Sequence, residues 1–332
     1  MKIAVVGLGY WGPNLVRNFS ASDRVTEVLC CDLDQSRVKK LVTKFPHVEA
    51  VATFEDVLAS DCDAVAIATP MSTHYPMALQ ALRAGKHVLV EKPMALSVRE
   101  CEEMIRCAED NHRVLMVDHT FLYTGAVRKM KEIVERGDIG DIYYFDSVRV
   151  NLGLFQHDAN VIWDLAPHDI SIMDYMLGRP PKTVSAVAVN HYNHVEDVAY
   201  LSVDFGDRMM GHVHVNWLAP VKIRRILIGG SKKMIVYNDM EPSEKVKVYD
   251  TGVKIVGREG IYKTLVEYRT GDMFSPKLDH TEALTLVVKD FIESIECGRR
   301  PVSDGQTGLR IVQMLEAAQQ SVRQGGMKVS IP

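Results

Sequence analysis

A glycine-rich segment near the start of the chain is the first pattern whose residue types and spacing indicate chemistry. Gly7, Gly9 and Gly12 form G-x-G-x-x-G, directly after the apolar run Ile3–Val6 and before an amphipathic stretch that reaches about Ser20. Between a strand and a helix, such glycines permit a tight turn, close approach of the backbone to a pyrophosphate, and close helix–strand packing. The helix N-terminus would supply N–H groups to the phosphates. We therefore expect a dinucleotide site, the alternative being a glycine turn without a ligand.

The residues around this pattern select among dinucleotides. Tyr10 and Trp11 lie inside it and are predicted to contact the cofactor. Asp32 ends the next apolar run, where an acidic residue holds the ribose hydroxyls of NAD. Asp34 would add to repulsion of the 2′-phosphate of NADP, whereas Arg37 would accommodate it. NAD is expected and NADP stays open, and Asp32 could also be a strand-capping residue without a ligand.

Elements that would position these residues alternate between strand and helix. Apolar runs occur at Ile3–Val6, Val25–Cys31, Ala64–Ala68, His87–Val90 and Val114–Val117, and helical patterns at Gln35–Phe45, His74–Ala84 and Ser97–Asn111. This alternation predicts an α/β domain with a doubly wound parallel sheet, a Rossmann domain over residues 1–122. Thr69 and Pro70 follow the third run, at the edge where open sheets bind ligands, and are predicted cofactor contacts. His74 either lies near the cofactor or starts a helix.

The pattern changes after Tyr123. A helix at Ala126–Arg136 precedes strand-like stretches at Ile142–Asn151, Thr183–Val189, Val198–Phe205, Met209–Trp217, Ile223–Ile228 and Met234–Tyr237. Consecutive strands predict a C-terminal α+β domain over residues 123–332, with a large, mostly antiparallel sheet and helices on one face. Gly229, Gly230 and Ser231 indicate a hairpin. Two helices end the chain, near His280–Cys297 and Gln306–Gln324, and the last is a candidate to pack on the first domain.

Composition excludes several classes of protein. The chain has 332 residues, enough for two domains. A net charge of −4 argues against a nucleic-acid partner, which usually requires a basic face. No apolar stretch approaches the ~18 residues that span a bilayer, and no signal-peptide pattern is present. The six cysteines are scattered without metal-ligand spacing, so we expect reduced thiols, no metal, no membrane partner and a cytoplasmic protein.

Four elements together resemble the Gfo/Idh/MocA oxidoreductases. They are the glycine pattern, Ala68-Thr69-Pro70 with His74, Glu91-Lys92-Pro93 after the fourth apolar run, and Asp164 with His168. The resemblance extends over essentially the whole chain, and Glu-Lys-Pro is its most specific part. It implies that Glu91 and Lys92 contact the cofactor, that Lys92 also contacts the reacting hydroxyl, and that Asp164 and His168 position the substrate and move the proton.

The chemistry of these residues agrees with the implied catalytic roles. Residues four apart share a helical face, so Asp164 and His168 can point into one cleft. Histidine, with an ordinary pKa of about 6.5, suits removal of a hydroxyl proton, and Lys92 can stabilise a developing alkoxide. The alternatives are that Asp164 caps the helix running to Leu177, that His168 is a packed or surface residue, and that Lys92 is solvated.

The segment before Asp164 narrows the substrate class. It resembles the corresponding loop of family members that act on nucleotide-activated sugars, including UDP-sugar 3-dehydrogenases and 3-ketoreductases. Its polar residues are Asn151, Gln156, His157, Asp158 and Asn160, and its aromatic residues are Phe155 and Trp163. Asn151, Gln156, Asn160, Trp163, Asp164 and His168 are the predicted substrate contacts. A polar surface loop is the alternative.

Three further clusters have alternative interpretations. Lys222, Arg224 and Arg225 could meet a diphosphate, although a solvated strand edge is the simpler explanation. His212, His214 and Asn216 alternate on one strand face and could border the cleft or an oligomer interface. Asp279 and Glu282 are typical of a capping box before a helix.

These observations predict an NAD-dependent enzyme that oxidises a secondary ring hydroxyl of a sugar, and C3 of a UDP-activated amino sugar is the expected position. A 3-ketoreductase or inositol-type dehydrogenase using NADP(H) is the alternative enzyme, because the catalytic residues are the same in both directions. A non-catalytic, cofactor-sensing regulator is the alternative of another class. The resemblance also implies a homodimer or homotetramer.

Overall fold

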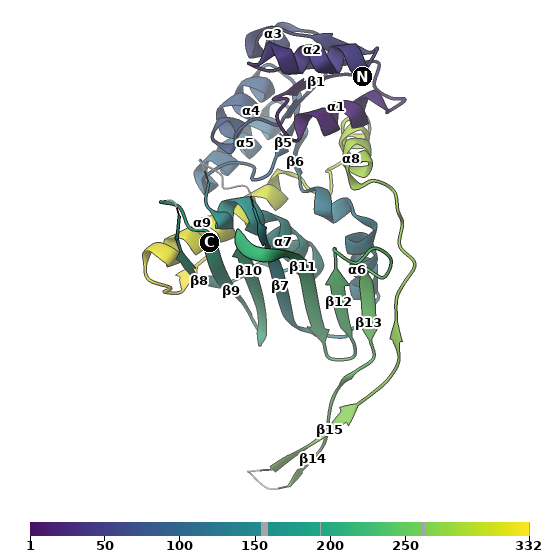
Figure 1. The fold of residues 1–332 in the computed structure, drawn as a ribbon, viewed down its shortest axis with the longest axis vertical. Coiled ribbons are helices and arrows are strands. Elements are labelled where there is room, and N and C mark those ends of the chain that lie inside the picture. The colour runs from purple at the N-terminus through teal and green to yellow at the C-terminus, as the bar shows by residue number, and fades with distance from the viewer. Residues whose placement is uncertain (154–158, 193, 260–262, 332) are drawn as a thin grey trace. The chain divides into compact units, whose positions relative to one another are not determined.

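The chain folds into two units (Figure 1). The structure, a computed structural model, describes residues 1–153, 159–192, 194–259 and 263–331. The first unit comprises Met1–Tyr123 and Thr281–Glu316, and the second comprises Thr124–His280 and Ala317–Pro332. Thr281–Glu316, which lies beyond the predicted domain boundary at residue 123 and includes the start of the last predicted helix, belongs to the first unit. Among the described residues, no helix is long and apolar enough to cross a membrane.

The first unit is built on a six-stranded parallel sheet, which confirms the doubly wound Rossmann prediction. Its strands are β1 (Lys2–Val6), β2 (Glu27–Cys31), β3 (Val48–Ala50), β4 (Ala64–Ile67), β5 (His87–Glu91) and β6 (Leu115–Asp118), in the order β3-β2-β1-β4-β5-β6. The order reverses beside β1, and ligands bind at such a switch point in open sheets. The short strand β3 was missed because two of its three residues are exposed, so it lacks an apolar run.

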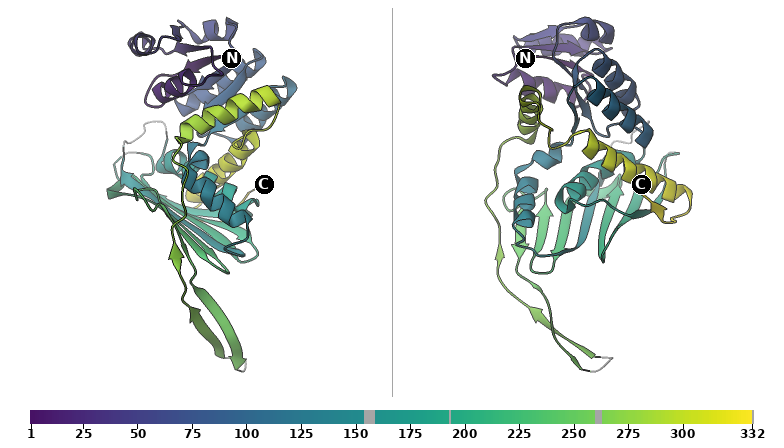
Figure 2. Two further views of the ribbon diagram at one scale, coloured as in Figure 1. Left: turned by 90° about the vertical axis from the view of Figure 1, so that its right-hand side faces the viewer. Right: turned by 180° about the vertical axis from the view of Figure 1, so that it is seen from behind.

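Helices surround this sheet. They are α1 (Gly12–Ser20), α2 (Gln35–Lys44), α3 (Phe54–Ala59), α4 (His74–Arg83), α5 (Val98–Asp110), α8 (Ala283–Cys297) and the start of α9 (Gly305–Arg323). Helix α8 packs on α1, and α4 packs on α5. The two pairs flank the sheet on opposite sides (Figure 2). Burial of both faces explains why the sequence shows continuous apolar strands.

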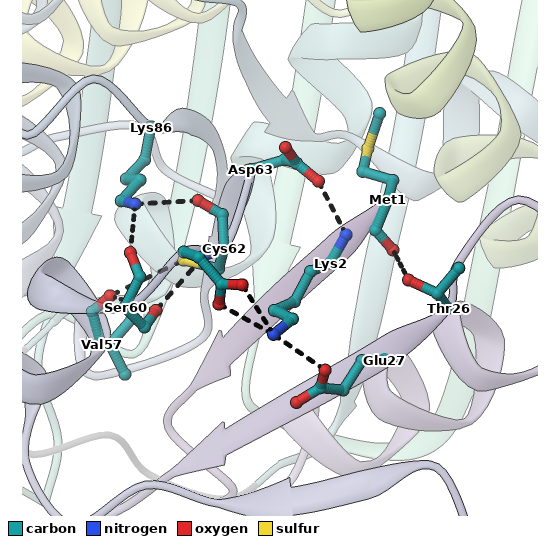
Figure 3. Close-up of polar contacts among 10 residues, drawn as sticks. Met1, Lys2, Thr26, Glu27, Val57, Ser60, Cys62, Asp63 and Lys86 are labelled. Atoms are coloured by element: carbon teal, nitrogen blue, oxygen red, sulfur yellow. Dashed lines mark hydrogen bonds and ion pairs between the residues drawn. The ribbon is translucent and has the colours of Figure 1, made fainter.

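The amino ends of the strands are closed by a network around Lys2 and Lys86 (Figure 3). Lys2 Nζ contacts carboxylates of Glu27 at 2.9 Å and Asp61 at 2.8 Å, which raise the pKa of the lysine. Lys86 Nζ donates to the carbonyl oxygens of Ser60 at 2.6 Å and Cys62 at 2.9 Å. These contacts satisfy charges at the sheet edge opposite the glycine loop, so we assign them to stability.

A nine-stranded sheet forms the centre of the second unit. Its strands are β7 (Ile142–Leu152), β8 (Thr183–Val189), β9 (Val198–Gly206), β10 (Met209–Asn216), β11 (Leu218–Gly230), β12 (Met234–Asn238), β13 (Val246–Tyr249), β16 (Met273–Phe274) and β17 (Val329–Ser330). All neighbouring strands pair antiparallel except β7 and β10, which confirms the mostly antiparallel prediction. A separate pair, β14 (Gly252–Glu259) and β15 (Lys263–Arg269), forms a hairpin of its own.

Helices α6 (Gly125–Glu135) and α7 (Val161–Leu177) lie on one face of this large sheet (Figure 2). Side chains on the β strands alternate between buried and accessible, as expected when one face is covered. On the covered face Arg149 of β7 forms a bidentate ion pair with Asp169 of α7, with Nε–Oδ2 at 2.6 Å. Both side chains are 3% exposed. This pair fixes the rotation of α7 on the sheet.

The predicted hairpin is confirmed, because β11 and β12 pair antiparallel, but β11 includes Gly229 and Gly230, so the turn begins at Ser231. One local sequence prediction was wrong. The predicted capping box of Asp279 and Glu282 does not form. Glu282 is the N-cap of α8 but makes no side-chain capping bond, because its carboxylate pairs with Arg17.

Candidate active site

The glycine loop has the geometry that a pyrophosphate requires. Gly7 has φ +89°, and a Cβ there would lie 2.6 Å from the carbonyl oxygen of Ala68. A Cβ on Gly12 would overlap the carbonyl oxygen of Gly7, so glycine allows α1 to start directly against β1. At Gly9 the nearest described atom to such a Cβ is Arg37 Nη1 at 3.8 Å. Space is therefore left open at the loop's middle glycine, and this cradle fits a dinucleotide phosphate.

Asp32 lies beside this loop at the end of β2. Its Oδ2 accepts a hydrogen bond from the backbone N–H of Leu8 at 2.5 Å, and its Oδ1 accepts one from Asp34 N at 2.7 Å. Arg37 Nη1 lies 3.8 Å from Asp32 Oδ2. Asp34 is the N-cap of α2, where it accepts from Ser36 N. The carboxylate proposed for the ribose and the arginine that could favour NADP are thus neighbours.

His74 ties two predicted cofactor segments together. It is 1% exposed and begins α4. Its Nδ1 lies 2.8 Å from the carbonyl oxygen of Pro93, and its Nε2 lies 2.9 Å from that of Thr69. The hydroxyl of Thr73 also bonds to the Pro70 carbonyl oxygen, at 2.7 Å. His74 therefore holds the Thr69-Pro70 loop against the turn after Lys92, in addition to starting the helix as predicted.

Glu91, which ends β5, meets a second acid that sequence reasoning missed. Burial, and then the Asp118 carboxylate, raise the pKa of Glu91 well above its usual value, and the two side chains hydrogen-bond. Asp118 Oδ2 also accepts from Trp11 Nε1 at 2.8 Å, and its Oδ1 accepts from Thr120 Oγ1 at 2.7 Å. Asp118 thereby links the glycine loop to the Glu-Lys-Pro segment. Its position at the end of a parallel strand was the signal that could have identified it.

Lys92 follows directly, and its peptide bond to Pro93 is cis. His119 on the next strand's end is 1% exposed, and neither of its ring nitrogens has a hydrogen-bond partner within the described ranges. Burial, and then the charge of Lys92, lower the pKa of His119 to about 3. A neutral imidazole therefore lies near the Lys92 ammonium.

In the second unit, α7 begins about one turn before Asp164. Asp164 is therefore not the residue that caps this helix, which was the alternative to its catalytic role. Asn160 is the N-cap, and its Oδ1 accepts from the N–H groups of Ile162 and Trp163, each at 3.1 Å. Its Nδ2 donates to Glu196 Oε2 at 2.7 Å and to Gln319 Oε1 at 2.6 Å. Asn160 is 7% exposed. Its hydrogen-bonding capacity is used in ordering the helix start, which argues against the predicted substrate contact.

Asp164 therefore lies inside the first turn of α7 and is not its N-cap. Its Oδ2 accepts a hydrogen bond from Trp217 Nε1 at 3.1 Å. Trp217, between β10 and β11, is 1% exposed. His168 follows one turn later and is half-buried, while its neighbour Asp169 points to the sheet and pairs with Arg149. The four-residue spacing places Asp164 and His168 on one side of α7, away from that ion pair.

The remaining predicted substrate residues are partly described. Trp163 in the first turn of α7 is half-buried, and Asn151 near the end of β7 is half-buried too. Gly153 N donates to the carbonyl oxygen of Trp217 at 3.0 Å, which holds the residue after β7 beside Trp217. Gln156 lies outside the described residues, as do Phe155, His157 and Asp158.

The cluster of basic residues at 222–225 and the cluster of histidines on β10 both lie on the large sheet. Strand β11 is an inner strand between β7 and β12, although its pairing with β12 begins only at Arg225. Arg224 Nη1 pairs with Asp239 Oδ2 at 3.2 Å, whereas Lys222 and Arg225 are exposed. On β10, His212 Nδ1 contacts Asp146 Oδ1 at 2.9 Å, and the His214 ring stacks on Tyr200 with centroids 4.3 Å apart. Within the described residues, no group of three or more His, Cys, Asp or Glu side chains is arranged for a metal ion.

Comparison with protein families gives matches over both units. The Gfo/Idh/MocA family described as "Oxidoreductase family, NAD-binding Rossmann fold" matches residues 1–119. The Gfo/Idh/MocA C-terminal domain matches residues 127–236. This chain is a Gfo/Idh/MocA oxidoreductase. The resemblance seen in the Glu-Lys-Pro segment is confirmed, and with it the enzyme class, an NAD(P)-dependent oxidoreductase with a sugar-type substrate.

Relatives of this Gfo/Idh/MocA protein act on sugars and cyclitols. UDP-N-acetylglucosamine 3-dehydrogenase of Acidithiobacillus ferrooxidans is 25% identical over 94% of both chains. Its crystal structure aligns with a TM-score of 0.81 at 24% identity, covering 98% of each chain. Myo-inositol 2-dehydrogenase of Thermotoga maritima is 23% identical, over 98% of this chain and 97% of its own. The structure of GenD2 from gentamicin A biosynthesis, in complex with NAD, has a TM-score of 0.83 at 23% identity, covering 100% and 96% of the chains.

Proposed function

We propose that this protein oxidises a secondary ring hydroxyl of a sugar, using NAD, and that the sugar is a UDP-activated amino sugar reacting at C3. The observation that carries the proposal is the Trp217–Asp164 hydrogen bond, because it orients the Asp164 carboxylate one turn before His168. The named activity of the Acidithiobacillus ferrooxidans relative supports the substrate class. Bound NAD would supply the hydride acceptor.

Each catalytic residue has a distinct role in this proposal. His168 takes the hydroxyl proton as general base. Lys92 stabilises the developing alkoxide with its ammonium group. Asp164, held by Trp217, orients the substrate or the histidine. The pyrophosphate side of the cofactor is held by Gly7, Gly9, Tyr10, Trp11 and Gly12, and its adenosine ribose is held by Asp32. At the carboxyl edge of the sheet, the cofactor is contacted by Thr69, Pro70 and Glu91.

Asp32 and Arg37 bear on the choice between NAD and NADP. The Asp32 carboxylate disfavours a 2′-phosphate, and its contact with Leu8 N keeps it at the ribose position. Arg37 lies close enough to that carboxylate to be partly neutralised by it. NAD is therefore our proposal. The alternative is an NADP(H)-dependent 3-ketoreductase or inositol-type dehydrogenase, and a Bacillus subtilis relative is named as an NADP(+) scyllo-inositol 2-dehydrogenase.

The test is NADH formation, followed by absorbance, with purified protein, NAD and a panel of UDP-sugars, free polyols and inositols. Activity with one UDP-amino sugar is expected, with losses of about 10²–10⁴-fold in Lys92→Ala and His168→Ala. Lys328→Ala and His47→Ala, at exposed positions of the same residue types, are the matched controls and should keep full activity. Activity confined to inositols would favour the alternative enzyme. Tight cofactor binding without turnover in either direction would favour the non-catalytic regulator.

We further propose a homodimer or homotetramer that forms through the sheet face opposite α6 and α7. Tyr200, Met210, Val187 and Val189 are exposed apolar side chains on β8, β9 and β10. An uncovered face with this composition suits a second copy of the chain. Light scattering after gel filtration should give a multiple of the protomer mass. The double variant Tyr200→Glu with Val187→Glu should give a lower mass.

We also propose a cytoplasmic location, supported by six free cysteines.

A further inference from the structure

Two carboxyl groups meet at the carboxyl ends of β5 and β6. The strand register places Glu91 opposite Asp118, and their side chains hydrogen-bond. Asp118 is 2% exposed. Glu91 Oε1 is buried and has no hydrogen-bond partner in the described part of the chain. Two ionised carboxyl groups in contact repel each other strongly, so one proton must lie between them.

The hydrogen bonds decide which group carries that proton. Asp118 accepts from Trp11 Nε1 and Thr120 Oγ1, and donors of this kind favour an ionised carboxylate. Glu91 has no such donors among its described contacts other than the Lys92 backbone. The charged and titratable neighbours are Lys92, which favours an ionised Glu91, and His119, which burial keeps neutral. Burial and Asp118 raise the pKa of Glu91 above its usual value, and Lys92 acts in the opposite direction.

We propose that Asp118 is a positioning residue of the cofactor site, which holds Glu91 as a neutral carboxyl group and fixes the indole of Trp11. The neutral Glu91 donates to Asp118, and this bond keeps Asp118 in place to hold the Trp11 indole at the glycine loop, where the dinucleotide binds. This inference rests on the proposed cofactor contacts of Trp11 and Glu91. It predicts constant cofactor affinity over the pH range in which Glu91 stays protonated, and weaker binding above it.

Infrared spectroscopy of the cofactor-free protein tests the protonation directly. At neutral pH the wild type should show a protonated-carboxyl C=O band that is absent from Glu91→Gln. In Asp118→Asn the same band should disappear at a pH at least about one unit lower, because the neighbouring charge is gone. Glu49→Gln, at an exposed position of β3 in the same sheet, is the matched control and should keep the band unchanged. The absence of a band that depends on Glu91 would overturn the proposal.

Cofactor affinity gives a second measurement, by NADH fluorescence across pH. Wild type should lose affinity above the pH at which the infrared band disappears, by about tenfold for one lost hydrogen bond. Glu91→Gln, which mimics the neutral carboxyl, should bind at all pH values tested, and Asp118→Asn should lose affinity at a lower pH than wild type. A pH profile that is the same in all three proteins would contradict the inference. Neither measurement uses a sugar, so an inactive protein with the expected band would instead count against the proposed reaction.

Discussion

Trp217 donates from its indole nitrogen to Asp164 Oδ2 at 3.1 Å and so fixes the orientation of a carboxylate in the first turn of α7. The donor is rigid because Trp217 is 1% exposed and its backbone N–H bonds to the Asp197 carbonyl oxygen at 2.9 Å. Asn160 caps the same helix, so Asp164 is not needed for that purpose. Asn160 therefore orders the start of α7, and Trp217 orients the Asp164 carboxylate.

Replacing Trp217 with Phe should lower kcat/KM with the sugar substrate by roughly 10–100-fold, because a hydrogen bond to a charged group contributes about 1.5–3 kcal/mol. Steady-state kinetics with the substrate identified in the UDP-sugar panel would measure this. Tyr237→Phe removes one hydrogen bond, to Asp239, from another buried aromatic of the same sheet, and should leave kcat/KM unchanged. Equal losses in the two variants would mean that general destabilisation of the sheet, rather than Asp164, is responsible.

The buried ion pair between Arg149 and Asp169 should be essential to the second unit as long as either charge remains. Asp169→Asn should reduce the free energy of unfolding by about 3–5 kcal/mol, because it leaves a buried guanidinium without its carboxylate. Replacing both residues, as Arg149→Met with Asp169→Leu, should recover most of that loss. Urea unfolding followed by tryptophan fluorescence is the measurement.

The exposed pair of Arg136 and Asp138 is the control for that experiment, and Arg136→Met should cost less than about 1 kcal/mol. If Asp169→Asn were as mild as Arg136→Met, the ion pair would not be what holds α7 in its rotation.

Asp32 should determine the selectivity between the two nicotinamide cofactors. Asp32→Ser removes the charge that repels a 2′-phosphate and leaves Arg37 able to bind it. The ratio of kcat/KM for NADP to that for NAD should rise by about 10–100-fold, since close like charges cost a few kcal/mol. Adding Arg37→Ala should cancel much of the gain. An unchanged ratio in Asp32→Ser would place the selectivity elsewhere in the first unit.

His119 should contribute to loss of stability in acid. Its pKa is about 3 in the folded protein, below the ordinary value of about 6.5, so the unfolded chain binds the proton first as the pH falls. The stability that depends on a neutral His119 is complete above about pH 6.5 and decreases from there toward pH 3. In His119→Phe this part of the slope should vanish, with no loss at neutral pH, because the ring nitrogens have no described partner.

Urea midpoints across this pH range would show the effect. His87, whose burial lowers its pKa to about 4, should leave a residual slope in the variant. His47→Asn, at an exposed position, should follow the wild-type curve. A His119→Phe curve parallel to that of wild type would show that His119 does not titrate between the folded and unfolded states.

Much of the first unit was determined by the sequence alone. Gly7, Gly9 and Gly12 require a particular backbone and close packing, and these requirements can be read locally because only glycine meets them. Buried parallel strands need continuous apolar runs, so β1, β2, β4, β5 and β6 were all predicted. The short strand β3 lacks such a run and was missed, and so was the helix α3 (Phe54–Ala59), whose capping box of Thr53 and Asp56 was not recognised.

The partners of the site residues depend on tertiary structure. Asp118 meets Trp11 across 107 positions of sequence, and Trp217 meets Asp164 across 53. Such pairings depend on strand register and helix rotation, which the local periodicity of the sequence does not reveal. Asp164 and Asn160 are both good helix caps by residue type, and the choice between them follows from the bonds of Asn160 to Glu196 and Gln319. The sequence determined which groups this protein carries and on which elements they lie. The packing of strands and helices decided which of those groups touch, because each contact is made by residues that local patterns cannot connect.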